Sequence, residues 1–478
     1  MKDSPIWFGP ISNGEYEPFA PEHGPAAERM VAELANEHAP KHGMDRRSFL
    51  RGPLGTAAAL LAISRLTGCK DGGADPYGNI DEDLLCDAEA ARELLSGDEF
   101  VLDAQTHHVD AEDTSWQGQG WLNFLAYLAS EAGCPDGTVD CFSYESFVHE
   151  VFVESDTTVA LISAVPAVPE SSPLNNERMY DTLRMVNQLA DSQRVIMHAG
   201  VFPNLGDDHL DSMQTWRDQL EVSAWKTYTG FDTGSSEGWF LDDDTGQAFL
   251  ERVRAVGPRV VCIHKGLNLA EGGAIDYYSP RDMGPAAAAN PDIELVAYHS
   301  GYVNSNTEGP WDPSTEPQGV DRLIASALDA GLARNEGNVW AELGSTWQIV
   351  MQRPVEAAHL LGKLLVHLGE RRILWGTDSI WYGSPQAQIE AFRAFEIPES
   401  MQEEFGYPAL TADIKARILG LNAAELFGVD PAAARCTLAE DDGLAARRQR
   451  VRELGISSPG VYGPRTRRDW RKLLARGV

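Results

Sequence analysis

The sequence has few basic residues and lacks any apolar run long enough to cross a bilayer. Its 478 residues include 39 Lys and Arg against 72 Asp and Glu, which gives a net charge of −33 at neutral pH. A membrane-spanning helix needs about 18–20 apolar residues, so we do not expect an integral membrane protein. Nucleic-acid binding needs a basic surface, so we exclude nucleic acid as a partner. The 43 % of hydrophobic residues is enough for a large folded core.

Cysteine is also scarce. The six cysteines are Cys69, Cys86, Cys134, Cys141, Cys262 and Cys436. No two of them form a CxxC pair, which disfavours a cysteine-based zinc site. Cys134 and Cys141 are close enough in sequence for a loop disulfide in an oxidising compartment. Cys262 lies in an apolar stretch and is expected in the core.

One short apolar segment near the N-terminus has the order of an export signal. Arg46-Arg47-Ser48-Phe49-Leu50 resembles a twin-arginine signal, Pro53 to Ile63 is apolar, and Leu66-Thr67-Gly68-Cys69 resembles a lipobox. This order predicts a leader over residues 1–69, export by the twin-arginine route, and a lipid anchor on Cys69 at the periplasmic or cell-surface membrane. The alternative is a buried N-terminal helix that carries two arginines. The start of translation, Met1 or Met44, stays open.

Residues 100–435 repeat one unit, a short apolar and β-branched run followed by a turn and a helical pattern. The strand-like runs are Phe100–Val109, Thr158–Pro166, Arg194–Phe202, Ala224–Gly230, Arg259–Gly266, Glu294–Tyr302, Asn338–Ser345 and Arg372–Ile380. The helical segments between them include 175–191, 245–256, 318–332 and 354–369. This alternation predicts an α/β fold, a (β/α)8 TIM barrel, with a doubly wound open sheet as the structural alternative.

Two segments flank the predicted barrel. Residues 70–99 are typical of a linker followed by a short helix. Residues 436–478 form a tail with a positive net charge from Asp441 onward. We expect this tail to be helical and to pack on the acidic barrel of the same or a neighbouring subunit, which would give a homo-oligomer.

Histidines gather where the predicted strands end, which is the end of a barrel that carries chemistry. His107, His198, His264 and His299 lie at these ends, and Asp378 follows the eighth strand. Neutral imidazoles and a carboxylate are ligands that zinc, manganese or iron take. The sequence therefore predicts a site for a divalent metal, with zinc as the first choice and manganese or iron as alternatives.

This set resembles the amidohydrolase superfamily, in particular the amidohydrolase-related branch that includes metal-dependent decarboxylases of aromatic and unsaturated acids. That branch has H-x-H on the first strand, His on the fifth and sixth, and Asp on the eighth, and the segment Ile418–Gly428 resembles its C-terminal signature. The resemblance implies metal ligands at His107, His264 and Asp378. It also implies acid/base roles for His299 and Asp378, next to a metal-bound water of lowered pKa.

Gln105 departs from this pattern, because it stands where the family has the first histidine of H-x-H. Three interpretations stay open. Water completes the shell of the other three ligands, Gln105 ligates through its oxygen or through water, or the site holds no metal and is inactive. His108 could replace the missing ligand, but strand alternation points it away.

Lys226 on the fourth strand leaves a further alternative open. Binuclear members of the superfamily carry a carboxylated lysine on that strand, with the histidines of the fifth and sixth strands on the second metal. The other interpretation, which we prefer, is a cation that binds a substrate carboxylate. His198, Glu342 and Trp381 are further candidates for the substrate pocket. Loop aromatics are expected to form an apolar lid over it: Trp116, Trp121, Trp239, Trp381 and Tyr382.

Three functions are consistent with these residues, each with a small molecule as the partner. The first is a metal-dependent hydrolase that uses metal-activated water on a small organic amide, ester or lactone. The second is a metal-dependent, non-oxidative decarboxylase in which Lys226 holds the carboxylate. The third is a non-catalytic binding lipoprotein.

Overall fold

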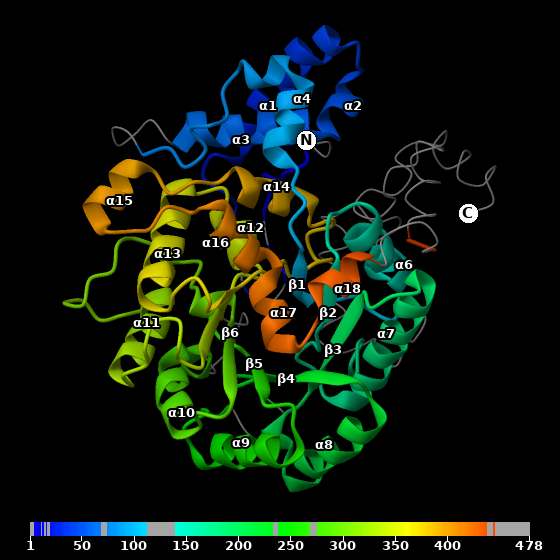
Figure 1. The fold of residues 1–478 in the computed structure, drawn as a ribbon, viewed down its shortest axis with the longest axis vertical. Helices are drawn as coiled ribbons and strands as arrows, with labels where there is room; N and C mark the ends of the chain where they lie inside the picture. The colour runs from blue at the N-terminus through cyan, green and yellow to red at the C-terminus, as the bar shows by residue number, and fades with distance from the viewer. Residues whose placement is uncertain are drawn as a thin grey trace.

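A computed structural model of the chain describes residues 4–10, 12–13, 16, 20–67, 74–111, 139–232, 238–267, 275–436 and 443–444. Its centre is a barrel of eight parallel strands that follow one another in sequence order (Figure 1). The strands are β1 (Leu102–Thr106), β2 (Val159–Ile162), β3 (Val195–Gly200), β4 (Val222–Tyr228), β5 (Val260–His264), β6 (Glu294–Tyr298), β7 (Val339–Glu342) and β8 (Ile373–Leu374). The predicted (β/α)8 TIM barrel is confirmed, and each strand overlaps its expected run.

Backbone hydrogen bonds beyond the short strand β8 close the barrel against β1. Ala104 N donates to Trp375 O at 3.0 Å, and Asp378 N donates to Gln105 O at 2.9 Å. His107 N then donates to Ser379 O at 2.6 Å. These bonds extend the pairing along the segment that follows β8, so Asp378 lies directly beside the end of β1.

Helices fill the connections, as the apolar periodicity predicts. Those of the barrel layer include α7 (Asn176–Ala190), α8 (Asp207–Gln219), α9 (Asp244–Val256), α10 (Met283–Ala289), α11 (Val320–Asp329) and α13 (Pro354–His367). Side chains cap several of them, since Asn175 accepts from Arg178 N and Asp243 accepts from Gly246 N. Further helices are α6 (Tyr144–Phe147), α12 (Thr346–Val350), α14 (Gln386–Ala394), α15 (Glu399–Phe405), α16 (Ala412–Ala416) and α18 (Pro431–Cys436).

Helix α17 (Asn422–Phe427) covers the end of the barrel at which the strands begin. Asn422 Nδ2 donates to Ile373 O at 2.8 Å, which ties the helix to the start of β8. Ala423 and Ala424 are buried in the same apolar cluster as Leu102 of β1. This end is filled by apolar packing, and the polar side chains lie at the opposite mouth.

Four N-terminal helices form a separate layer on the barrel, which we call the N-terminal layer (Figure 1). They are α1 (Gly24–His38), α2 (Arg46–Leu50), α3 (Pro53–Thr67) and α4 (Ala88–Leu95). Every residue from Leu54 to Ser64 is buried, and α3 contacts α1, α4, α13 and α14. The apolar segment of the predicted leader is therefore a packed helix here. Export and cleavage of this segment stay predictions.

Among the helices that the structure describes, none is long and apolar enough to span a membrane. Cys69, Trp116, Trp121, Cys134 and the predicted helices of the tail lie outside the described residues. Cys141 is disulfide-bonded, and burial raises the pKa of the Cys262 thiol in β5 to about 12. Trp239, expected in a lid, is buried and packs edge-on against Phe249.

Candidate metal centre at the barrel mouth

Three histidines at the strand ends each have one ring nitrogen against a backbone carbonyl. His107 Nδ1 is 2.8 Å from Ser163 O, and His299 Nδ1 is 2.7 Å from Gly344 O. His264 Nε2 is 3.1 Å from both Gly266 O and Leu267 O. A carbonyl oxygen only accepts, so these nitrogens carry hydrogen, and the other nitrogen of each neutral ring has a lone pair. Metal-binding histidines are commonly oriented in this way.

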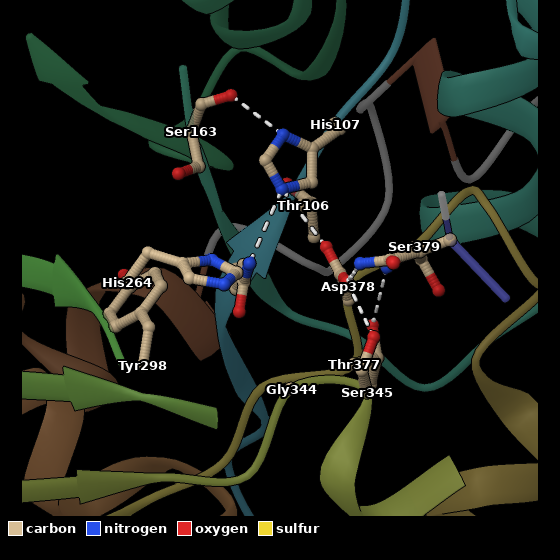
Figure 2. A network of polar contacts seen from close by, with 12 residues as sticks. Thr106, His107, Ser163, His264, Tyr298, Gly344, Ser345, Thr377, Asp378 and Ser379 are labelled. Atoms are coloured by element: carbon tan, nitrogen blue, oxygen red, sulfur yellow. Dashed lines mark hydrogen bonds and ion pairs between the residues drawn. The ribbon is translucent and has the colours of Figure 1, made fainter. Parts of the chain in front are cut away.

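The second nitrogen of each ring faces another polar side chain of the mouth. His107 Nε2 lies 3.0 Å from Asp378 Oδ1, and His299 Nε2 lies 3.1 Å from His264 Nδ1. Figure 2 shows His107 between Ser163 on one side and Asp378 on the other. Burial lowers the pKa of His299 to about 4 and the pKa of His264 well below its usual value. Both rings are therefore neutral at pH 7. A cation would relieve the repulsion between the lone pairs of His299 Nε2 and His264 Nδ1.

Asp378 contacts three other polar side chains of the mouth. Its Oδ2 accepts from Ser345 Oγ at 2.5 Å and from Asn13 Nδ2 at 2.5 Å, while Oδ1 faces His107. Burial acts to raise the pKa of Asp378, but His107, His299 and the Ser345 hydroxyl outweigh it and hold this pKa at about 2. The carboxylate is thus an anion at every pH at which an enzyme would work.

The backbone of the mouth is held in an unfavourable conformation. Among the described residues, seven other than glycine have positive φ, and five of these lie at the mouth. The five are Leu267, His299, Ser300, Ser345 and Asp378. Such conformations cost of order 1–3 kcal/mol each and cluster at functional sites. Three of these residues also belong to the polar contacts of the mouth, since Ser345 donates to Asp378 and His299 faces His264.

Gln105 lies next to His107, as expected for two residues on one face of β1. Its Nε2 is 3.5 Å from His107 Nε2, and its buried Oε1 has no hydrogen-bond partner among the residues that the structure describes. A Cβ at Gly344 would collide with Gln105 Oε1 and lie 2.6 Å from Glu342 Oε1, so only glycine fits there. A 180° rotation of the amide exchanges its oxygen and nitrogen, which brings a neutral oxygen ligand beside His107 and Asp378. Gln105, His107 and Asp378 together therefore fit a divalent cation.

The candidate ligand residues form two pairs rather than one compact group. In the described part of the chain, three or more His, Cys, Asp or Glu ligand atoms lie within 4.8 Å of one another only at Glu37, His38 and Glu82. At the mouth, the structure brings together His107 with Asp378 and His264 with His299. We call Gln105, His107, Ser345 and Asp378 the acidic half of the mouth, and His264 with His299 the imidazole half.

The other predicted site residues are buried around these two halves. Lys226 Nζ lies 3.8 Å from the ring centroid of Tyr298, and His198 Nε2 lies 2.9 Å from the Tyr298 hydroxyl. Trp381 stacks on the His107 ring with centroids 5.5 Å apart. Glu342 accepts from His299 N at 3.0 Å and from Gly344 N at 2.6 Å, and burial raises its pKa to about 8.

His108 points away from the mouth, as strand alternation predicts. Its Nε2 lies 2.7 Å from Thr182 Oγ1 on α7, outside the barrel. It is therefore no substitute for the histidine that Gln105 replaces.

Sequence reasoning missed Ser345 of the acidic half and Asn13, which donates to Asp378. Ser345 follows β7 in a left-handed conformation that no residue preference indicates, since serine is uncommon there. Asn13 belongs to a segment far from the barrel in sequence and without apolar periodicity. The only signal for Ser345 was its place at the end of the seventh predicted strand, and no signal pointed to Asn13.

The solved structures that match the chain do so at low sequence identity. They include an uncharacterized TIM-barrel protein from Bordetella bronchiseptica (14 % identity, 69 % of this chain and 98 % of that chain, TM-score 0.47). A 5-carboxyvanillate decarboxylase from Novosphingobium aromaticivorans, complexed with manganese, has 10 % identity over 69 % of this chain and 96 % of that chain (TM-score 0.43). A putative 2-pyrone-4,6-dicarboxylic acid hydrolase from Pseudomonas putida has 15 % identity over 70 % of this chain and 99 % of that chain (TM-score 0.41).

No curated protein matches the sequence. A family model does match, over residues 178–429, which is more than half of the 478 residues. The match includes β3 to β8 with His264, His299 and Asp378, and it ends at the C-terminal signature. The chain belongs to the amidohydrolase family.

Proposed function

We propose that this chain is a metal-dependent hydrolase that cleaves a small organic amide, ester or lactone. The observation that carries the proposal is the contact between His107 Nε2 and Asp378 Oδ1, which lie 3.0 Å apart. Because His107 Nδ1 donates to Ser163 O, the neutral form of the ring would offer the lone pair of Nε2 to a cation beside the Asp378 carboxylate. Membership of the amidohydrolase family supports an enzyme.

His107 and Asp378 would hold the cation, with the Gln105 amide as a third, neutral ligand. A divalent cation at this place would acidify a water molecule and polarise the bond to be cleaved. Zinc is our first choice because imidazole and carboxylate suit it, and manganese or iron suit the same donors. The facing lone pairs of His264 and His299 would supply either a further ligand or the acid/base group.

His299 is the best placed proton acceptor. Its ring is neutral at pH 7, and Nδ1 stays bonded to Gly344 O while Nε2 takes a proton. Glu342 fixes the backbone at this point, because it accepts from His299 N. Trp381 covers the His107 ring and keeps bulk water from the site.

A second candidate, non-oxidative decarboxylation of an aromatic or unsaturated acid, is favoured by Lys226. Its ammonium group is fully buried and lies over the rings of Tyr298 and Tyr228, 3.8 Å and 4.8 Å from their centroids. Lys226 also lowers the pKa of His264, after the larger effects of burial and of His299, so it is close to the imidazole half. A substrate carboxylate beside it would be held next to the proposed cation.

Metal analysis of the purified full-length chain tests the proposal. We expect about one to two equivalents of zinc, manganese or iron, and loss of activity with a chelator that added metal restores. Less than about 0.2 equivalents, with no gain in activity on adding metal, would instead favour a protein that only binds. Release of carbon dioxide against cleavage of esters, amides and lactones separates the two enzymatic candidates.

We also propose that the chain is exported by the twin-arginine route and anchored through Cys69. The support is the order of Arg46-Arg47, the apolar segment and Cys69 in the sequence. Replacing both arginines by lysine should retain the protein in the cytosol, whereas a Cys69→Ala variant should still be exported but lose the anchor. Equal membrane fractionation of all three forms would contradict the proposal.

A further inference from the structure

The N-terminal segment reaches the centre of the barrel mouth. Asn13 is 1 % exposed, and its Nδ2 donates to Asp378 Oδ2 at 2.5 Å, across 365 positions of sequence. Asp378 is the acid that the family pattern places on the eighth strand, and we propose it as a metal ligand. A residue outside both the family match and the predicted barrel thus contacts the central side chain of the site.

A second chain of contacts leads from the same segment to the same carboxylate oxygen. The Tyr16 hydroxyl lies 2.8 Å from the Tyr382 hydroxyl, which lies 2.7 Å from Ser345 Oγ. Ser345 Oγ then donates to Asp378 Oδ2 at 2.5 Å. Ser12 Oγ donates to Tyr16 O at 2.6 Å, which turns the chain so that Asn13 and Tyr16 both reach the mouth.

The preceding residues fix this segment on the barrel. Ile6 and Phe8 are buried, with 1 % and 3 % of their surface exposed. Gln352, which follows α12, donates from Nε2 to Trp7 O at 3.1 Å. The segment is therefore held on both sides of Asn13, and its position does not depend on one hydrogen bond.

These contacts decide which oxygen of Asp378 is available. Asn13 and Ser345 both donate to Oδ2, so rotation of the carboxylate would break two buried hydrogen bonds. Oδ1 is thereby directed at His107. Partners of this kind orient the ligands of metal sites and typically change metal affinity or activity about 10–100-fold when they are removed.

We propose that Asn13 is a positioning residue for Asp378 and that Ser12, Asn13 and Tyr16 belong to one wall of the active site. This inference rests on the proposed metal-dependent function. It makes the N-terminal segment part of the working enzyme, beyond any role in export. Lipidation of Cys69 as the first mature residue would remove Asn13, so this inference applies to the uncleaved chain, and the anchored form proposed above would lack this contact.

The test compares variants of the full-length chain, Asn13→Ala, Asn13→Asp and Asn13→Ser, with the exposed Glu22→Ala as the matched control. For Asn13→Ala we expect kcat to fall about 10–100-fold with KM nearly unchanged, and manganese affinity to fall about tenfold. Asn13→Asp should be worse, because it removes the donor and adds a like charge. Asn13→Ser keeps a donor and should recover part of the loss, and Glu22→Ala should match the wild type.

Several outcomes would overturn the inference. Higher activity in Asn13→Ala would mean that the segment plugs the mouth, and unchanged kcat and manganese affinity would mean that it is packing alone. Should Asn13→Ala unfold, Tyr16→Phe provides the test, because it removes only the hydroxyl that leads to Ser345 and should give a smaller loss of both quantities. A wild-type chain that binds manganese but turns over no substrate would refute the proposed reaction, while the comparison of affinities would still decide on Asn13.

Discussion

The two halves of the barrel mouth are built in different ways. In the imidazole half, the rings of His264 and His299 are oriented by carbonyls of nearby loops, Gly266, Leu267 and Gly344. In the acidic half, Asp378 is oriented by Ser345 and by Asn13, which comes from the other end of the chain. The imidazole half is thus a product of the barrel itself, whereas the acidic half depends on a segment outside it. Variants in the two halves should therefore behave differently.

Removal of the acid should have the largest effect. Asp378→Ala takes away the anion of the proposed cation site and leaves His107, Ser345 and Asn13 without their shared partner. We expect turnover to fall by about 10⁴-fold and bound metal to be lost. Steady-state kinetics and metal analysis of the same preparation measure both. Asp378→Ala with full metal content would place the cation elsewhere.

Variants of the two histidine pairs sharpen the comparison. His107→Ala should lose the metal, because His107 faces Asp378. His264→Ala should keep most of the metal but lower turnover by about 10²–10⁴-fold, since the imidazole half would supply proton transfer. Complete loss of metal in both variants would show a cation shared between the halves. Loss of half of the metal in each would support two cations, one for each half.

Much of the barrel was predictable from the sequence, and much of the detailed site was not. Period-two apolar runs separated by helical patterns placed every strand, and parallel strand ends must meet, which placed His107 near Asp378. The orientation of His264 depends on two carbonyls that follow β5, and residue types carry no information about them. Asn13 reaches the site through tertiary packing alone, because nothing in its local sequence selects that contact.

Core substitutions compare the N-terminal layer with the barrel. Leu60 of α3 and Leu361 of α13 are both fully buried. Each substitution to alanine should reduce the free energy of unfolding by about 2–5 kcal/mol. We expect a single unfolding transition for both variants, measured by circular dichroism in denaturant. A separate early transition that shifts only in Leu60→Ala would show that the N-terminal layer unfolds independently of the barrel.

The smallest effect concerns acid stability, through a histidine that belongs to neither half. Burial lowers the pKa of His108 to about 4, and its Nε2 lies 2.7 Å from Thr182 Oγ1. The folded pKa lies below the unfolded value of about 6.5, so the unfolded chain binds the proton first. The contribution of His108 to stability is complete above about pH 6.5 and is lost as the pH falls toward about 4, by about 3 kcal/mol at most. The free energy of unfolding, measured by denaturant titration between about pH 7 and pH 4.5, should fall less steeply in His108→Asn than in the wild type. Identical slopes would show that other buried groups carry the acid sensitivity.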